Sequence, residues 1–587
     1  DDFFAMIRKA ELLMEDNQRD AALTLLAKAR SIDPEHIEAI TLSVEAMLSS
    51  LRDQQDISTE DLDTLRELID RPEEHAELLV LQIERLLKPL KVSPAPAVVS
   101  SSDLNQALDL LLELSLLTIE RPSLASQNAT LFSHPTRQFT LDAWLTARVA
   151  EVVAIAEDAT IAEFDARMRE QLQSRIRPNR MTLNRVVEHF SPLGRAVDAF
   201  QRSVIDQSHQ QGDALVTERL IWGTRLTTDS GAAELDTTSL LTLAEAYSLA
   251  GWGEDRRYIG QILQQRIQEP DAAPEEIAEI AAVLDEFQVR GAVRVDPESW
   301  PRGHVELQWE STRLPQTQAL ISDRRYARTT RLMGRQMLGW QAISDNSPLS
   351  LLDHDGISHP ISVEGLTNRN SSDKEVTISG GLMLVLTPSE LIAIDLFRVL
   401  SPGADDAVRW RQSLRPDGQP VAKRRSETSK FGDQIYRYVS NSPTANADDA
   451  QLRLGPVLGD RLFLLQGRDL ICYHTVTGEQ IWRTQTAIPG SGVVAGEGRV
   501  AVVSERANQV AYFDWYDGRE IVTVPLDVES VIATAGRHVL MVKKASEQEG
   551  DVELYDPYLL EIVDGISRES VRSRMASPIN LTDEVRS

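Results

Sequence analysis

Residues 469–483 read Asp469-Leu-Ile-Cys-Tyr-His-Thr-Val-Thr-Gly-Glu-Gln-Ile-Trp-Arg483. A short apolar run ends at His474, a Thr477-Gly478 pair follows, and Trp482 lies four residues beyond the glycine. Glycine allows the positive φ angle that a tight hairpin requires, and tryptophan supplies a large apolar surface for packing. The stretch therefore predicts two antiparallel strands joined by a turn, with Trp482 as the main packing residue.

Related copies of this pattern precede and follow it. Asp514 is followed by a turn that ends at Gly518, although Val522 occupies the tryptophan position. Asp395 is followed, after a longer connection, by Trp410. Two weaker copies are Leu351-Leu-Asp353 with Asp355-Gly356, and Leu554-Tyr-Asp556.

The copies recur at a regular interval. The turn positions 474, 514 and 556 are spaced by 40 and 42 residues, which suits one four-stranded sheet per repeat. The step from 395 to 474 is longer, which a polar insertion over 411–450 would explain, and we expect no regular element in that insertion. Short apolar runs bounded by Gly, Asp or Ser predict strands at 382–386, 391–394, 461–465, 499–503 and 538–542.

This pattern resembles the repeat of pyrroloquinoline-quinone-type β-propellers, in which a strand ends in Ala-x-Asp, a Thr-Gly turn follows and a tryptophan lies four residues beyond the glycine. The resemblance implies that Trp482 packs between neighbouring blades. The sequence departs from the family pattern at Cys472, in the alanine position, and at His474, in the aspartate position. Four to five blades can be counted, whereas closed propellers more often have about six to eight. We therefore expect an incomplete ring in this chain.

The first half of the chain has a different composition. Residues 1–290 contain 7 of the 30 glycines, and glycine is costly inside helices. Apolar residues recur there at three- and four-residue spacing, which is typical of amphipathic helices. Besides the first two helices, helices are predicted near 36–51, 59–70, 73–88, 103–119, 139–156, 160–173, 195–207, 213–224, 237–249, 254–268 and 274–287.

Residues 3–36 contain the clearest helical motif. Ala10, Ala22 and Ala29 are small residues that let two helices approach closely, and Pro34 follows the second helix. This resembles a tetratricopeptide repeat, a helix pair of about 34 residues. Lys9 and Asn17 depart from that pattern, since the family usually has an apolar residue and a turn glycine there. An ordinary helical hairpin is the alternative.

Together these patterns predict an α + β multidomain protein, with an N-terminal α-solenoid followed by an all-β propeller that is incomplete in this chain. We expect tetratricopeptide-like repeats over 1–92, a further helical repeat region over 103–290, and the propeller over 300–587. The Pro- and Ser-rich stretch 91–102 between the two helical regions is typical of a flexible joint.

Composition excludes several classes of partner. The chain has 587 residues, with 61 Lys and Arg against 90 Asp and Glu, a formal net charge of −29. Such a balance argues against binding to nucleic acid or to anionic lipid, and the basic cluster 423–425 is expected in a solvated loop. No window is apolar enough for a membrane helix. The chain opens without an initiator Met, and we expect it to be processed or trimmed.

The propeller resemblance raises one enzymatic alternative. Quinoprotein dehydrogenases of that family bind a quinone and a calcium ion on the propeller axis, often beside an adjacent cysteine pair. Cys472 is the only cysteine, so the pair is excluded within one chain. No compact set of Glu, Asn and Asp can be assigned to the metal. We therefore expect no cofactor and no catalytic or metal-binding residues.

Smaller motifs favour structural roles. The glycines from Gly490 to Gly498 precede a predicted strand rather than a helix, which indicates a turn and not a phosphate-binding loop. Asp353-His-Asp-Gly356 lacks the spaced ligands of a calcium loop, and His354 with His359 has no third metal ligand. Cys472 is expected to be a small buried residue and His474 to bond its own hairpin. Ser-His-Asp chemistry requires proximity that a sequence does not show, and no Gly-x-Ser-x-Gly elbow is present.

The leading hypothesis is a non-enzymatic scaffold that binds proteins through a helical groove and a propeller face, with steering toward a basic partner surface. A quinone-dependent dehydrogenase is one alternative. A structural subunit of a cell-envelope assembly, with self-assembly, is another. We favour a bacterial periplasm or cell envelope over the cytoplasm.

Overall fold

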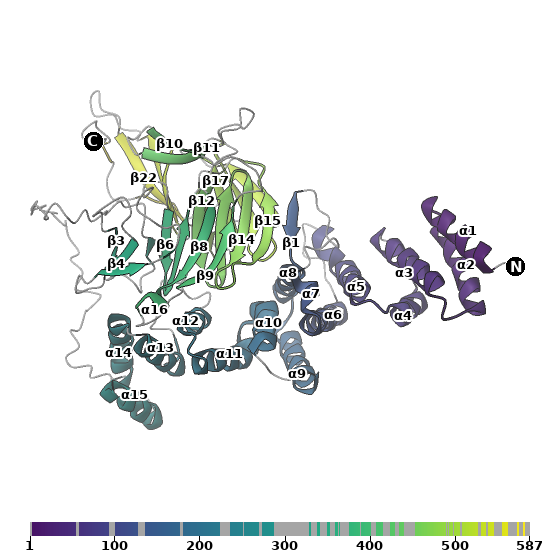
Figure 1. Cartoon of the computed structure of the whole chain (residues 1–587), viewed down its shortest axis with the longest axis horizontal. Helices are drawn as coiled ribbons and strands as arrows, with labels where there is room; N and C mark the ends of the chain where they lie inside the picture. The colour runs from purple at the N-terminus through teal and green to yellow at the C-terminus, as the bar shows by residue number, and fades with distance from the viewer. Residues whose placement is uncertain are drawn as a thin grey trace, which may run out of the picture. The chain divides into compact units, whose positions relative to one another are not determined.

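A computed structural model of the chain divides into two compact units, Asp1–Gln201 and Arg202–Ser587 (Figure 1). The structure describes residues 3–53, 58–92, 100–126, 136–175, 180–222, 235–250, 252–268, 273–286, 328–329, 337–340, 349–352, 358–361, 363, 375–387, 389–400, 407–414, 423–428, 434–439, 452–488, 490, 492–496, 498–504, 507–525, 530–535, 538–544, 554–561, 572–574 and 579–580.

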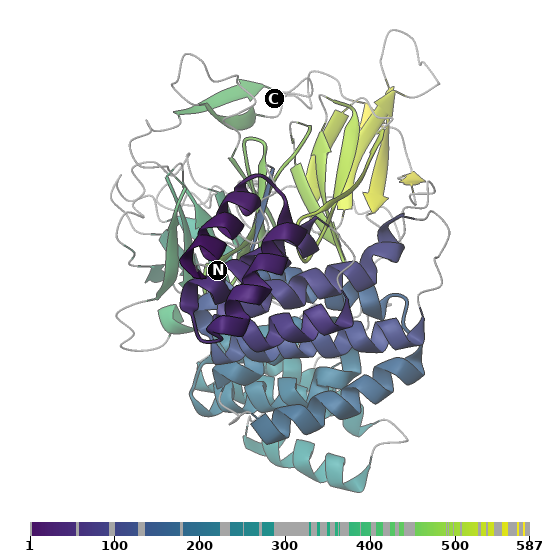
Figure 2. The same ribbon diagram turned by 90° about the vertical axis from the view of Figure 1, so that its right-hand side faces the viewer.

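The first unit is built from helices. They are α1 (Phe3–Glu15), α2 (Arg19–Ile32), α3 (Ile37–Arg52), α4 (Thr59–Leu68), α5 (Pro72–Val92), α6 (Ser101–Glu120), α7 (Pro122–Ser126), α8 (Leu141–Val153), α9 (Asp158–Arg175), α10 (Arg180–Phe190) and the 3-10 helix η2 (Ser191–Val197), with the short strand β1 (Arg137–Phe139). Successive helices lie side by side (Figure 2). Ser58, Ser100 and Thr140 cap α4, α6 and α8, because each hydroxyl accepts a hydrogen bond from a free N–H of the first turn.

The α1–α2 pair packs through its small residues. Ala10 and Ala22 are fully buried with Leu26, and Ala29 is buried beside Ile7. Such small side chains bring the two helix axes close together. Asn17 adopts a positive φ of 62° in the connecting turn, a conformation that asparagine tolerates better than most residues. Pro34 follows the end of α2 at Ile32.

Helix α10 was missed by the sequence prediction, which had no helix between 173 and 195. Val186 and Val187 lower its intrinsic helix propensity. The helix forms because Leu183, Val186 and Phe190 are buried in the packed unit, and tertiary packing supplies most helical stability in proteins.

The second unit combines helices with antiparallel sheets. Its helices are α12 (Ala214–Trp222), α13 (Thr237–Leu249), α14 (Gly253–Ile267), α15 (Pro274–Glu286) and α16 (Leu396–Leu400), and α11 (Asp198–Gln210) crosses the boundary between the units. Sheet 1 holds β3 (Met337–Trp340), β4 (Leu349–Leu352) and β5 (Ser358–Ile361); sheet 2 holds β6 (Glu375–Ser379), β7 (Leu382–Leu386), β8 (Glu390–Asp395) and β9 (Val408–Ser413), with β2 (Arg328–Thr329) parallel to β6.

Three further sheets follow along the chain. Sheet 3 holds β12 (Leu452–Leu458), β13 (Arg461–Gln466), β14 (Asp469–His474) and β15 (Gln480–Gln485); sheet 4 holds β16 (Gly492–Gly496), β17 (Arg499–Ser504), β18 (Gln509–Asp514) and β19 (Glu520–Pro525); sheet 5 holds β20 (Ser530–Ala535), β21 (His538–Lys544), β22 (Leu554–Glu561) and β23 (Arg572–Arg574), with β24 (Ile579–Asn580) beside β22. The first strands of sheets 2 to 5, namely β6, β12, β16 and β20, contact one another in that order. The sheets therefore form a row in chain order. The predicted strands at 382–386, 391–394, 461–465, 499–503 and 538–542 are confirmed.

One hydrophobic core joins the helices of this unit to its sheets. Leu215 of α12 and Leu243 of α13 belong to the same buried cluster as Leu384 and Ile392 of sheet 2 and Leu462 of sheet 3. The helices are therefore part of the same folded body as the sheets.

Three sequence predictions about the strands were wrong. Residues 411–450, expected to lack regular structure, contain the end of β9 and the antiparallel pair β10 (Lys423–Thr428) and β11 (Gln434–Val439). The basic cluster 423–425 thus lies in a strand and not in a loop. Asp556 does not end its strand, because the apolar residues after it continue β22 to Glu561, which pairs with His538.

No described helix has the length and apolar character needed to cross a membrane.

Candidate functional site

The turn between β14 and β15 is held by His474. Its Nδ1 atom accepts hydrogen bonds from the backbone N–H groups of Val476 and Thr477, both at 3.2 Å. Gly478 follows with a positive φ of 73°. His474 thus accepts the turn hydrogen bonds at the position where the repeat pattern has an aspartate. The expected hydrogen bond to its own hairpin is present.

A tryptophan from each of two sheets packs on the turn of the next sheet. The Trp410 indole N–H of sheet 2 donates to the Thr475 carbonyl of sheet 3 at 2.8 Å. A Cβ atom added to Gly478 would lie only 2.5 Å from the Trp410 ring. Glycine is therefore required at position 478 for two reasons: its positive φ angle, and the tryptophan ring that lies directly against its backbone.

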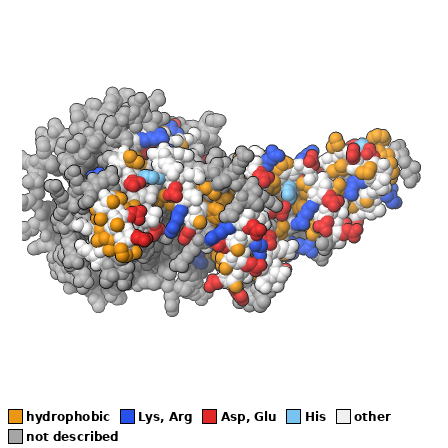
Figure 3. Space-filling view, turned by 90° about the horizontal axis from the view of Figure 1, so that it is seen from below, with side chains coloured by type: hydrophobic (Ala, Val, Ile, Leu, Met, Phe, Trp, Pro, Cys, Tyr) orange, Lys and Arg blue, Asp and Glu red, His pale blue; other side chains and the backbone are white. Residues whose placement is uncertain are grey.

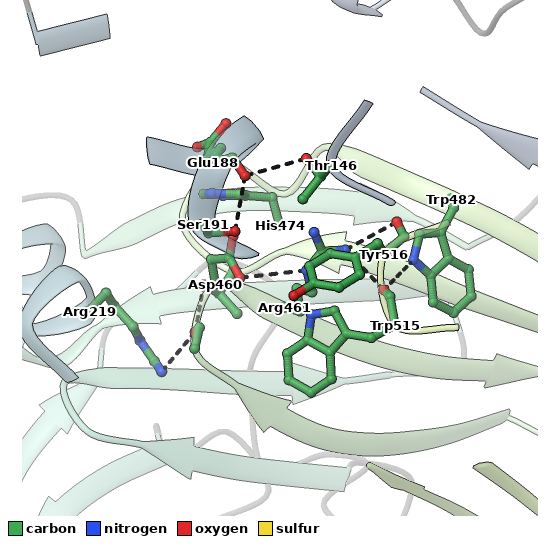
Figure 4. A network of polar contacts seen from close by, with 12 residues as sticks. Thr146, Glu188, Ser191, Arg219, Asp460, Arg461, His474, Trp482, Trp515 and Tyr516 are labelled. Carbon is green, nitrogen blue, oxygen red and sulfur yellow. Dashed lines mark hydrogen bonds and ion pairs between the residues drawn. The ribbon is translucent and has the colours of Figure 1, made fainter. Parts of the chain in front are cut away.

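The same contact recurs one sheet later. The Trp482 indole N–H donates to the Trp515 carbonyl at 2.9 Å (Figure 4). A Cβ atom on Gly518 would lie 2.5 Å from the Trp482 ring. Gly518 has a φ of 70°. Sheets 2, 3 and 4 are thus joined by a repeated contact between tryptophan and turn. The structure brings together Trp410 with Gly478 and Trp482 with Gly518, and Thr477 is exposed in its turn.

Two arginines add polar contacts at these turns. The Arg461 guanidinium donates to the Trp515 carbonyl at 3.1 Å and lies over the Tyr516 ring (Figure 4). Arg219, which comes from α12, donates to the Ser379 carbonyl of sheet 2 and to the Gly459 carbonyl of sheet 3. A helix residue therefore links the first turns of two neighbouring sheets. No sequence pattern marked either arginine as a site residue.

The two repeat aspartates sit in different surroundings. Asp395 accepts from the Phe397 N–H at 3.0 Å and from Arg409, which also binds Asp213 at the start of α12. Burial raises the Asp395 pKa despite that arginine. Asp514 accepts from the Tyr516 N–H at 2.7 Å, and burial together with the nearby Asp517 raises its pKa to about 6.

A buried carboxyl group lies where α12 meets sheet 2. The Tyr247 hydroxyl donates to Glu218 Oε1 at 2.9 Å, and the Gly381 N–H donates to Oε2 at 2.7 Å. Burial raises the Glu218 pKa to about 7, although Arg219 and both donors oppose that shift. Tyr247 also stacks with Trp252 and Phe397. The contact therefore combines stacked aromatic rings with a buried carboxyl group.

The helical unit contains a buried serine, histidine and aspartate side by side. Ser115 Oγ of α6 lies 2.8 Å from His189 Nδ1 of α10. His189 Nε2 lies 2.9 Å from Asp142 Oδ1 of α8, within ion-pair distance. Ser115 and His189 are almost completely buried. Ser115 sits inside a helix, where the neighbouring N–H groups bond the helix itself and cannot stabilise an oxyanion. The group links three helices rather than presenting a nucleophile.

Cys472 is buried in β14, as expected. Burial raises the pKa of its thiol to about 12, so the reactive thiolate is scarce at neutral pH. Residues 353–357, including His354, lie outside the described residues, and His359 lies in β5. Gly492 and Gly496 bound strand β16 and Gly498 lies in the turn before β17, so this glycine-rich segment lies between strands and starts no helix.

The described residues include no group of three or more His, Cys, Asp or Glu side chains placed to hold a metal ion. Exposed apolar side chains occur on α1–α3, where Phe4, Ile32 and Ile37 face solvent and the apolar atoms gather at that end of the unit (Figure 3).

Comparison with known proteins gives one family match. Residues 397–521 match the model of the family described as outer membrane protein assembly factor BamB. This range begins in α16, ends in β19 and includes all four residues of the two tryptophan–glycine contacts, Trp410, Gly478, Trp482 and Gly518. No curated protein matches the chain.

Solved structures are similar only at a low level. They include Kuenenia stuttgartiensis hydrazine synthase (10% identity, 46% of this chain and 69% of that chain, TM-score 0.26), BamB from Moraxella catarrhalis (13% identity, 42% and 72%, TM-score 0.21) and Saccharomyces cerevisiae Sqt1 (8% identity, 39% and 56%, TM-score 0.24). The match thus spans little more than half the length of the Sqt1 chain. Similarity at this level carries no argument about function.

Proposed function

We propose that this chain is a non-enzymatic scaffold that binds other proteins, and that its sheets are successive blades of an incomplete β-propeller. The observation that carries the proposal is the repeated contact of Trp410 with Gly478 and of Trp482 with Gly518. It lies inside the segment that matches the assembly-factor family. A row of sheets held in this way presents its turns as a broad surface, which suits a protein partner.

The helices would supply a second binding surface. The close α1–α2 pair, with Ala10, Ala22 and Ala29 buried between its helices, supports a tetratricopeptide-like solenoid with a concave groove. The exposed Phe4, Ile32 and Ile37 are of the kind that protein partners bury. The family description, which names an outer membrane protein assembly factor, supports a role in a bacterial cell envelope.

Site-specific photo-crosslinking in cells that express the chain tests this proposal. A photoreactive residue is placed at exposed Ile37, at exposed Thr477 or at exposed Ala487, and a control is placed at exposed Glu279 of α15. We expect at least one of the first three positions to form an adduct of one defined mass that excess unlabelled chain suppresses. Absence of an adduct at all three positions would contradict the scaffold role.

The dehydrogenase alternative has its own readout. Purified protein is mixed with pyrroloquinoline quinone and Ca²⁺, and both thermal unfolding and dye reduction are followed. The scaffold proposal expects neither a shift nor reduction. Dye reduction that depends on both additions would replace it.

A further inference from the structure

The contact between α12 and sheet 2 is built around a carboxyl group that has no access to solvent. Glu218 is 2% exposed, and each of its oxygens accepts one hydrogen bond, from Tyr247 and from the Gly381 N–H. A Cβ atom on Gly380 would lie 2.5 Å from Glu218 Oε2. The turn between β6 and β7 therefore approaches the carboxyl group as closely as a bare backbone permits.

Arg219, Tyr247 and Asp395 act on this carboxyl group directly, and further charged groups act on those three residues. Arg219 comes from the same helix, Tyr247 from α13 and Asp255 from α14. The sheets contribute Asp395, Arg409 and Asp460, and Asp213 binds Arg409 at the start of α12.

Arg219 does not neutralise Glu218 through a hydrogen bond. Its guanidinium donates instead to the Ser379 and Gly459 carbonyls. An ionised Glu218 would thus carry its charge in a buried space with two neutral donors as its hydrogen-bond partners, which is costly.

We propose that Glu218 is a pH-sensitive latch between helices α12–α13 and sheet 2, which is tight while the carboxyl group is neutral and loosens when it ionises. Opening of the contact would expose the turn at Ser379–Gly381 and free α12 from the sheet. Opening of the latch would change the contact between the helices and the sheets of this unit, while the hydrogen bonds within each helix and within each sheet stay intact.

The direction follows from proton linkage. The pKa of Glu218 is raised from 4.5 to about 7 by burial. Because the pKa is raised in the closed contact, the neutral carboxyl group stabilises that contact. This stabilisation is fully present below the ordinary glutamate pKa and is lost as the pH rises through about 7. If the open state restores the ordinary pKa, the equilibrium constant for opening rises about tenfold between pH 6 and pH 8.

Hydrogen–deuterium exchange of the full chain tests the latch. Protection of segments 214–222 and 379–386 is measured at pH 6 and pH 8 and corrected for the intrinsic pH dependence of exchange. We expect about a tenfold loss of protection in the wild type at pH 8. Glu218→Gln should remove this loss, while Glu279→Gln, which changes an exposed glutamate on α15, should keep it.

A second variant keeps the test independent of whether Glu218→Gln folds. Tyr247→Phe removes a donor that favours the ionised carboxylate, so the transition should move to higher pH. An identical pH profile in the wild type and Glu218→Gln, or an unmoved transition in Tyr247→Phe, would overturn the proposal.

Discussion

Gly518 and Gly498 have the same backbone conformation but different packing contacts. Their φ angles are 70° and 73°. A Cβ atom on Gly518 would collide with the Trp482 ring, whereas one on Gly498 would meet no atom within 4 Å. The two positions therefore separate the cost of a left-handed backbone from the cost of displacing the tryptophan.

Gly518→Ala should destabilise the second unit more than Gly498→Ala. The backbone strain costs about 1 kcal/mol at either position, and displacing a buried ring adds about 2 kcal/mol at Gly518. Chemical denaturation of both variants measures the free energy of unfolding. Equal losses would show that Trp482 does not pack firmly on this turn.

Cys472 should react with thiol reagents only when the chain unfolds. Its burial and its raised pKa of about 12 predict labelling more than about a hundredfold slower in the native protein than in denaturant at pH 8. Mass spectrometry after timed alkylation gives both rates. Rapid native labelling would mean that sheet 3 opens frequently.

The sequence pointed to some of these residues and not to others. The spacing of Thr477, Gly478 and Trp482 predicts a hairpin and a packing residue, because a positive φ angle and a large ring are local requirements. Glu218 and Arg219 carry no such signal. They are adjacent charged residues on a short helix, which ordinarily face solvent. They are buried in contacts with residues distant in the sequence, Tyr247, Ser379–Gly381 and Gly459.

Helices α6, α8 and α10 are joined by Ser115, His189 and Asp142. Burial by itself would raise the Asp142 pKa, but His189 and Arg185 outweigh it, so that pKa is lowered from 3.8. A lowered pKa contributes stability that is present above the ordinary value and is lost as the pH falls through the folded-state value. The link among these helices is therefore sensitive to acid.

Asp142→Asn should reduce the loss of unfolding free energy that the helical unit shows at acidic pH. The wild type loses part of its unfolding free energy as the pH falls from the ordinary carboxyl pKa of 3.8 toward the lower folded-state pKa, because the unfolded chain takes up a proton at Asp142 first. The variant, already neutral, should be less stable near pH 7 and should lose less on acidification. Urea denaturation at pH 3, 4 and 7 makes the comparison, with exposed Glu163→Gln of α9 as the control. Parallel profiles for wild type and Asp142→Asn would contradict the assignment.

Elements with strong local patterns were predicted well, and those that depend on distant partners were not. The helix at 237–249 was predicted with its observed bounds because Asp236 caps it and its apolar residues follow helical spacing. Strands β10 and β11 lie in a polar segment and are defined mainly by their pairing with each other. A single run of residues does not reveal such pairing, so the sequence did not predict these strands.

The second unit as a whole depends on a core that both kinds of element share. Leu215, Leu243 and Ile259 come from helices, while Leu384 and Ile392 come from sheet 2, and all belong to one buried cluster. Removing the helices would expose an apolar face of the sheets to water.

A chain that begins at Asp198, which keeps α11 whole, should fold, whereas one that begins at 291 should not. The shorter chain lacks α11–α15 and therefore 16 of the 40 described buried residues of the shared core, together with the Arg219 contacts to sheets 2 and 3. Circular dichroism during heating measures the outcome, and we expect a cooperative transition only for the longer chain. A cooperative transition in the chain from 291 would show that the sheets are independent of the helices.

The order of helices before sheets, the strands at 382–386, 391–394, 461–465, 499–503 and 538–542, and the hairpin of Thr477 and Gly478 with Trp482 follow from the sequence alone. Helical spacing, strand alternation and turn glycines are properties of neighbouring residues. The joining of α12–α15 to the sheets, the burial of Glu218 and Arg219, and the meeting of Ser115 with His189 and Asp142 were decided only by the tertiary structure. These features bring together residues far apart in the chain, and their energies come from desolvation and close packing, which no local pattern records.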